Sequence, residues 1–90
     1  MDVKEIEEML YERQKTHGAF PEVALLVHKA RNVFFDAFIA CDPAQSLAFD
    51  MILLKLARIS VGHCDNEDNW RDIAGYAVLG AGSIESKAEE

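Results

Sequence analysis

The sequence predicts a single all-α domain, a four-helix antiparallel bundle-like fold, from three observations. Apolar residues recur at three- and four-residue steps along most of the chain, which is the period of an amphipathic helix. Glycine and proline interrupt this pattern near residues 18–21 and 42–43, where helices are expected to end and begin. The chain has 90 residues, a length at which one small core must be packed efficiently or shared with a partner. A homodimer is therefore left open.

The first predicted helix covers residues 2–15. Its apolar positions recur at helical spacing, and charged residues fill most of the rest; the apolar set is Val3, Ile6, Met9 and Leu10. This pattern gives one apolar face and one acidic face. Gly18 follows, a residue suited to the left-handed backbone beyond a helix C-terminus, so a turn is expected before the next helix.

The second predicted helix begins at Pro21 and ends before Pro43. Proline is accommodated at the first position of a helix, because the amide that it lacks has no partner there. It also disfavours helical geometry in the residue that precedes it. An apolar stripe runs between the two prolines and includes Phe34, Phe35 and Phe38. This stripe is expected to form core or, alternatively, the interface of a dimer.

The third predicted helix runs from about residue 44 to residue 61 and should be the centre of the fold. Its only charged residues are Asp50, Lys55 and Arg58, so most of its circumference should be buried.

A fourth helix is predicted after the polar loop at residues 62–66, ending near Leu79. Its first turn is acidic, and the helix dipole favours negative charge there. Glycines then loosen the pattern. The domain is thus predicted to span residues 1–80, followed by a frayed acidic tail at residues 81–90.

The composition excludes several classes of function. The net charge is −7, from 16 acidic and 9 basic residues, and this charge would repel the phosphate backbone of a nucleic acid. It would suit a partner protein with a basic surface; the alternative is that it serves solubility alone. No apolar run is long enough to span a bilayer, and Cys41 and Cys64 lack the paired spacing of a zinc site. We therefore expect a cytoplasmic protein that binds neither nucleic acid directly nor a membrane.

One set of charged residues forms the candidate site. At about 100° per residue, Asp68 and Asp72 share a face of the fourth helix, while Lys55 and Arg58 are neighbours on the third. In a structural interpretation, Lys55 or Arg58 pairs with Asp72, and a partner for Asp50 comes from another helix. In a functional interpretation, Asp50, Asp68 and Asp72 hold Mg²⁺, and Lys55 and Arg58 bind the phosphate oxygens of a nucleotide. We favour the structural one, because ion-pair networks also gather such charges.

Three blocks of sequence resemble a known family. The most specific is Asp68-Asn69-Trp70-Arg71-Asp72-Ile73-Ala74-Gly75-Tyr76-Ala77, and it follows Thr16-His17-Gly18 and Lys55-Leu56-Ala57-Arg58-Ile59. Together they resemble an uncharacterised family of small phage and prophage proteins over roughly residues 10 to 80. The resemblance implies a phage origin, and hence the host bacterial cytosol as location, but no particular activity. The order of blocks is also similar to that of MazG-like all-α nucleotide pyrophosphohydrolases.

The chain departs from both families at positions that matter for metal binding. Ala19 and Leu47 stand where the phage family often has acidic residues, and the paired glutamates of MazG-like enzymes are missing from the second helix, where Glu22 and Asp36 lie far apart. These departures favour a non-catalytic protein without a cofactor. It would bind a host protein with a basic surface, for example to inhibit a nucleic-acid-handling or defence system such as CRISPR. The alternative is a Mg²⁺-dependent nucleotide-binding protein related to the MazG-like pyrophosphohydrolases.

Overall fold

A computed structural model describes residues 2–62 and 64–89, without the side chains at positions 16, 17 and 85–89. These residues form five helices and no strand; the helices are α1 (Val3–His17), α2 (Phe20–Val33), α3 (Phe35–Ala40), α4 (Pro43–Val61) and α5 (Glu67–Glu89). The predicted all-α fold is confirmed.

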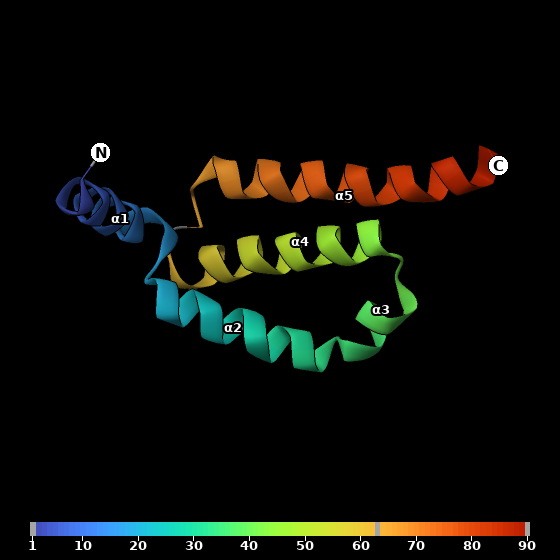
Figure 1. The fold of residues 1–90 in the computed structure, drawn as a ribbon, viewed down its shortest axis with the longest axis horizontal. Helices are drawn as coiled ribbons and strands as arrows, with labels where there is room; N and C mark the ends of the chain where they lie inside the picture. Colours follow the sequence, from blue (N-terminus) through green and yellow to red (C-terminus); the bar gives the residue numbers. More distant parts are fainter. Residues whose placement is uncertain (1, 63, 90) are drawn as a thin grey trace.

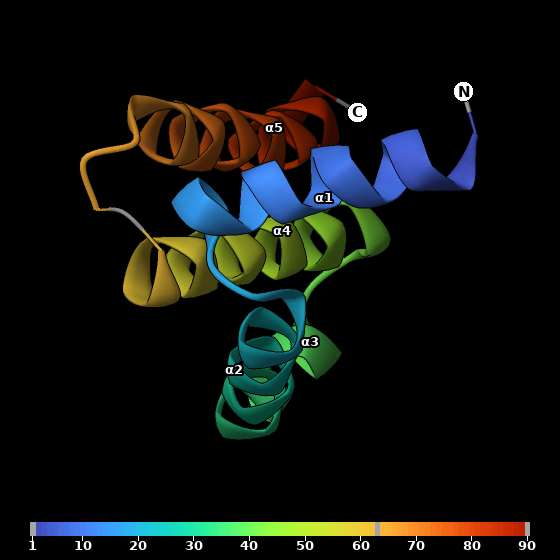
Figure 2. The same ribbon diagram turned by 90° about the vertical axis from the view of Figure 1, so that its left-hand side faces the viewer.

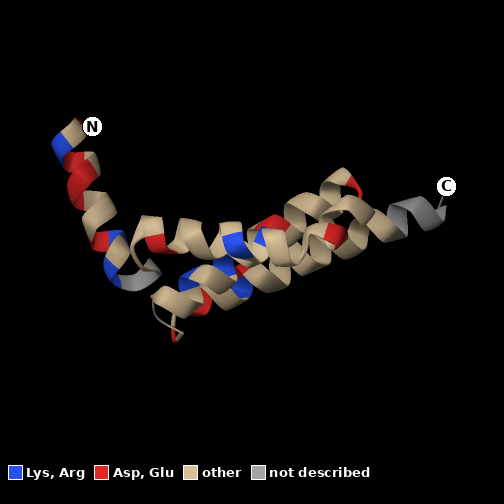
Figure 3. Cartoon of the chain, turned by 90° about the horizontal axis from the view of Figure 1, so that it is seen from below, with Lys and Arg blue, Asp and Glu red and all other residues tan. Residues whose placement is uncertain are grey.

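Three of the helices form a layer. α4 lies between α2 and α5 and runs antiparallel to both (Figure 1). The short α3 closes the end of the layer where α4 begins. α1 crosses the opposite end and projects away from the layer as an arm (Figures 2 and 3). The molecule is accordingly elongated, with extents of 50 × 28 × 26 Å.

Local hydrogen bonds set where the helices begin. The Asp2 side chain accepts a hydrogen bond from the backbone amide of Glu5, at 2.9 Å, and caps α1. Asp42 and Gln45 form a reciprocal capping box at the start of α4, which satisfies two amides that have no partner within the helix. Gly18 ends α1 with a φ of 80°, a conformation that glycine adopts without steric cost.

The second predicted helix is divided in two, and this is the main correction to the expected element order. The backbone leaves helical geometry at Phe34 (φ −100°, ψ 23°), which separates α2 from α3. The break lets Phe34 and Phe38 both meet the ring of Phe49 edge-on, with centroid distances of 5.6 and 4.9 Å. Such edge-to-face contacts favour the bent path, and the β-branched and aromatic residues nearby have modest helix propensity.

The fourth predicted helix continues well beyond Leu79. α5 reaches Glu89, so residues 81–89 of the predicted tail are helical. Two contacts with the start of α4 hold this extension: Gly80 lies close to Ala48, and the Ser83 hydroxyl donates a hydrogen bond to Asp42 at 2.6 Å. Tertiary contacts of this kind override the low helix propensity of glycine.

The hydrophobic core is small. The buried apolar side chains of the described residues are Val23, Ala48, Leu53 and Ala57. Three of them belong to α4, which confirms its central position. However, α4 is not buried around most of its circumference as predicted, because Leu47 and Leu56 are largely exposed. No helix among the described residues is both long and apolar enough to cross a membrane.

Candidate functional site

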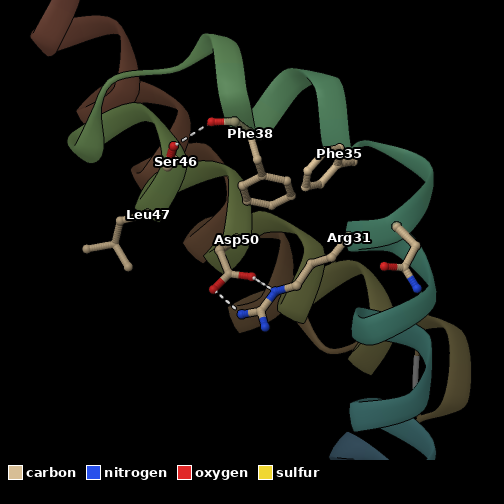
Figure 4. A pocket seen from close by; sticks show the side chains of 7 residues that line it. Arg31, Phe35, Phe38, Ser46, Leu47 and Asp50 are labelled. Carbon is tan, nitrogen blue, oxygen red and sulfur yellow. Dashed lines mark hydrogen bonds and ion pairs between the residues drawn. The ribbon is translucent and has the colours of Figure 1, made fainter.

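The predicted charge set is divided between two ion pairs on different sides of α4. Arg31 of α2 forms a bidentate pair with Asp50, with Nε to Oδ1 at 2.7 Å and Nη2 to Oδ2 at 2.5 Å (Figure 4). The hydrogen bond to Asp50 raises the pKa of Arg31 above its ordinary value, and the negative charge of the Asp50 carboxylate adds to this rise as the second cause. Asp50 thus receives its partner from another helix, as the structural interpretation required.

The second pair joins α4 to α5. Lys55 Nζ lies 2.8 Å from Asp72 Oδ2, and the side chains are 11% and 47% exposed, respectively. This is one of the two pairings that the structural interpretation predicted. The lysine stem is nearly buried, whereas the carboxylate is about half exposed to water. The pair therefore holds the two helices in one packing arrangement while the carboxylate keeps part of its hydration.

The structure does not bring the three predicted metal ligands together. Asp50 and Asp72 are held by separate cations, and Asp68 is exposed in the first turn of α5, where its amide bonds the Asn66 side chain at 3.1 Å. Within the described part of the chain, no group of three His, Cys, Asp or Glu residues could hold a metal ion.

Arg58, the second predicted phosphate-binding residue, has a different environment from Lys55. Lys55, Arg31 and Arg71 each hold a carboxylate. Among the described residues, no carboxylate lies within ion-pair distance of Arg58. Its side chain is half-buried at the end of α4. It is therefore a cation in a partly apolar setting with no carboxylate partner among the described residues.

A cavity of about 480 Å³ lies beside Arg58, at the corner where α1, α2 and α4 meet. Most of its wall is apolar, and its polar groups come from two arginines and one glutamine; the lining residues are Leu10, Arg13, Gln14, Gly18, Phe20, Val23, Leu54 and Arg58. An apolar cavity of this size with a few converging polar groups is typical of small-molecule sites. The sequence analysis missed it, because α1 and Arg58 are distant in the chain and only the tertiary fold joins them.

A buried asparagine beside the predicted site also escaped the sequence analysis. Asn69 is only 1% exposed, and its amide nitrogen has no hydrogen-bond partner among the described residues. Its spacing of four and seven residues from Ile73 and Tyr76 places it on the α5 face that packs on α4, and this spacing could have revealed it. The neighbouring Trp70 is half exposed, and its indole nitrogen donates to the Cys64 carbonyl at 2.8 Å.

Comparisons with known proteins place the chain in a family but add no activity. No curated protein and no solved structure matched the sequence. One family profile, described as a domain of unknown function (DUF6378), matches residues 3–84. This range includes α1, the corner cavity and both ion pairs. The chain therefore belongs to the uncharacterised DUF6378 family.

Proposed function

We propose that this protein binds a phosphorylated small molecule of the nucleotide class in the cavity between α1, α2 and α4. The observation that carries the proposal is the half-buried guanidinium of Arg58, which lines the cavity and has no carboxylate partner in the described structure. A partly buried cation without a counter-charge is unfavourable. An incoming phosphate would supply that charge, since a guanidinium matches phosphate oxygens in a bidentate geometry.

The remaining cavity wall suits the other part of a nucleotide. Arg13 adds a second guanidinium to the same cavity, while Leu54, Val23 and the ring of Phe20 give it an apolar side. A nucleotide combines an anionic phosphate with a flat, weakly polar base, and aromatic rings stack on such bases. The chain as a whole has a charge of −7, so two arginines on one cavity single out this corner as a place for an anion.

The proposal covers binding and not catalysis. Two of the three predicted Mg²⁺ ligands, Asp50 and Asp72, are held in separate ion pairs with Arg31 and Lys55. Breaking either pair to free a metal ligand would leave a cation without its partner. If the chain is related to the MazG-like enzymes, the two would therefore share the class of ligand, a nucleotide, and not the hydrolysis reaction.

Calorimetric titration with ATP, with and without Mg²⁺, tests the proposal. We expect saturable binding to the wild type and a loss of about tenfold or more in affinity for Arg58→Gln. Arg71→Gln is the matched control, because Arg71 is an exposed arginine of α5 whose ion-pair partner in the described part of the chain is Glu67 of the same helix. The proposal is wrong if no nucleoside triphosphate binds, or if both variants lose affinity equally.

A second candidate function rests on the acidic face of α1. The arm projects from the layer (Figure 3), and its exposed outer face includes Glu7, Glu8 and Tyr11. An acidic, projecting helix suits a partner protein with a basic surface. If the chain has the phage origin that its sequence resemblance implies, that partner would be a host protein, for example a component of a nucleic-acid-handling or defence system.

This candidate is tested by immobilising the wild type and two double variants and comparing the host proteins that each one retains. The comparison separates a specific contact of α1 from a non-specific effect of charge. Glu7→Gln/Glu8→Gln should lose a protein that the wild type retains, whereas Glu22→Gln/Asp36→Asn, which removes the same charge elsewhere, should keep it. Equal retention by both double variants would eliminate the α1 face as the binding surface.

A further inference from the structure

The chain exposes more surface than a compact domain of its size. A monomer of 10.1 kDa is expected to expose about 5,300 Å², whereas this chain exposes 6615 Å². Its radius of gyration is 15.5 Å, against about 12 Å for a compact chain of this length. The excess of roughly 1,300 Å² exceeds the area of about 800 Å² that each partner contributes to a typical stable interface.

Two apolar rows contribute to this excess. The first, the α1 stripe, consists of Val3, Ile6, Met9 and Leu10, all exposed on the projecting arm. The second, the α4 ridge, consists of Leu47, Met51 and Leu54, which recur every three to four residues on one side of α4. Among the described residues, the α1 stripe approaches the ridge of its own chain at the cavity, where Leu10 and Leu54 are both lining residues.

We propose that the α1 stripe and the α4 ridge form the interface of a homodimer. In a two-fold dimer the same surfaces are used by both copies, so the arm of each chain would lie along the α4 ridge of the other. A single chain supplies both halves of such a contact: an apolar row on an arm that stands clear of its own layer, and on that layer an apolar row that is exposed at Leu47 and partly exposed at Met51 and Leu54.

The charges beside the two rows favour a second copy as the occupant. Glu5 and Glu12 lie beside the α1 stripe, and Arg31, 52% exposed at its side chain, lines the same pocket as Leu47, with its partner Asp50 between the two (Figure 4). Arg31 already pairs with Asp50, and its exposed guanidinium would take Glu5 or Glu12 of the other copy as a second carboxylate. Such a contact at the rim of an interface favours the matching register. The outer acidic face of α1 stays free in this arrangement.

The test is the molar mass in solution, measured by sedimentation equilibrium, which does not depend on the elongated shape. At micromolar concentrations the wild type should have roughly twice the chain mass of 10.1 kDa. Two interface variants, Ile6→Gln/Met9→Gln and Leu47→Gln, should weaken the dimer about tenfold or more. Glutamine keeps helix propensity high, and circular dichroism confirms that each variant is folded.

Two control variants place a glutamine on the opposite faces of the same helices. Tyr11 is 64% exposed on the outer side of α1. Leu56 is 45% exposed and lies nine residues from Leu47, about half a turn around α4. Tyr11→Gln and Leu56→Gln should leave the dimer intact. A wild type that is monomeric throughout, or controls that dissociate as readily as the interface variants, would overturn the proposal.

Discussion

The ion pair between Lys55 and Asp72 predicts an asymmetric loss of stability when its two members are removed in turn. The Lys55 side chain is 11% exposed and that of Asp72 is 47% exposed. In Asp72→Asn, an almost buried ammonium loses its counter-charge and has little access to water. In Lys55→Met, the apolar stem is largely retained and the carboxylate left behind is half solvated.

The magnitudes follow from these two environments. Removing one member of a fully buried pair costs about 3–5 kcal/mol, and an exposed pair is worth at most about 1 kcal/mol. We expect Asp72→Asn to lower the free energy of unfolding by about 2 kcal/mol and Lys55→Met to lower it by less than about 1 kcal/mol. At roughly 4–8 °C per kcal/mol for a domain of this size, Asp72→Asn should melt roughly 10 °C lower.

Urea unfolding followed by circular dichroism measures both losses, with all variants at one protein concentration so that any association affects them equally. The double variant Lys55→Met/Asp72→Asn isolates the coupling between the two side chains, and its loss should be smaller than the sum of the single losses. The reasoning fails if Lys55→Met costs more than Asp72→Asn, or if the single losses simply add.

Three further predictions concern helix ends and glycines, and the urea midpoint tests each. Gly18→Ala should destabilise the fold by about 1–3 kcal/mol, because Gly18 has a φ of 80° and an added Cβ would overlap the Val61 side chain; an unchanged midpoint would contradict this. Gly75→Ala should stabilise it by about 0.5–1 kcal/mol, since nothing lies within 4 Å of the new methyl group; a loss of stability would show that Gly75 has a contact partner. Asp42→Ala should cost about 1–2 kcal/mol, because it removes the cap of α4 together with the acceptor of the Ser83 hydrogen bond, and a cost near zero would mean that neither contact holds these helices.

Periodicity predicted most of the fold, because an amphipathic pattern reports which side of a helix is buried. It placed α4 at the centre, and the predicted ends of α1 and α4 agree with the observed ends to within a few residues. It could not predict the break at Phe34, where the hydrophobic pattern continues unbroken and only the contacts with Phe49 favour a bend. It also ended α5 too early, because the contact of Gly80 with Ala48 is visible only in three dimensions.

The candidate site was predictable in part. Helix geometry predicted that either Lys55 or Arg58 pairs with Asp72, and in the structure the partner is Lys55. It also required a partner for Asp50 from another helix, as observed. That this partner is Arg31 depends on how α2 packs along α4, which the sequence does not encode in any local pattern. The cavity beside Arg58 could not be predicted for the same reason, because residues of α1 and α2 also line it.

The most direct test of the proposed binding site is an NMR titration of the unmodified protein with ATP, observing the arginine Nε–H resonances. Arg58 and Arg13 line the cavity, whereas Arg71 lies on the outer side of α5 in a pair with Glu67. We predict that the Arg58 resonance shifts in a saturable manner while that of Arg71 stays in place. Arg58 remaining unchanged at saturating ATP, or shifting only together with Arg71, would contradict a ligand site at this corner.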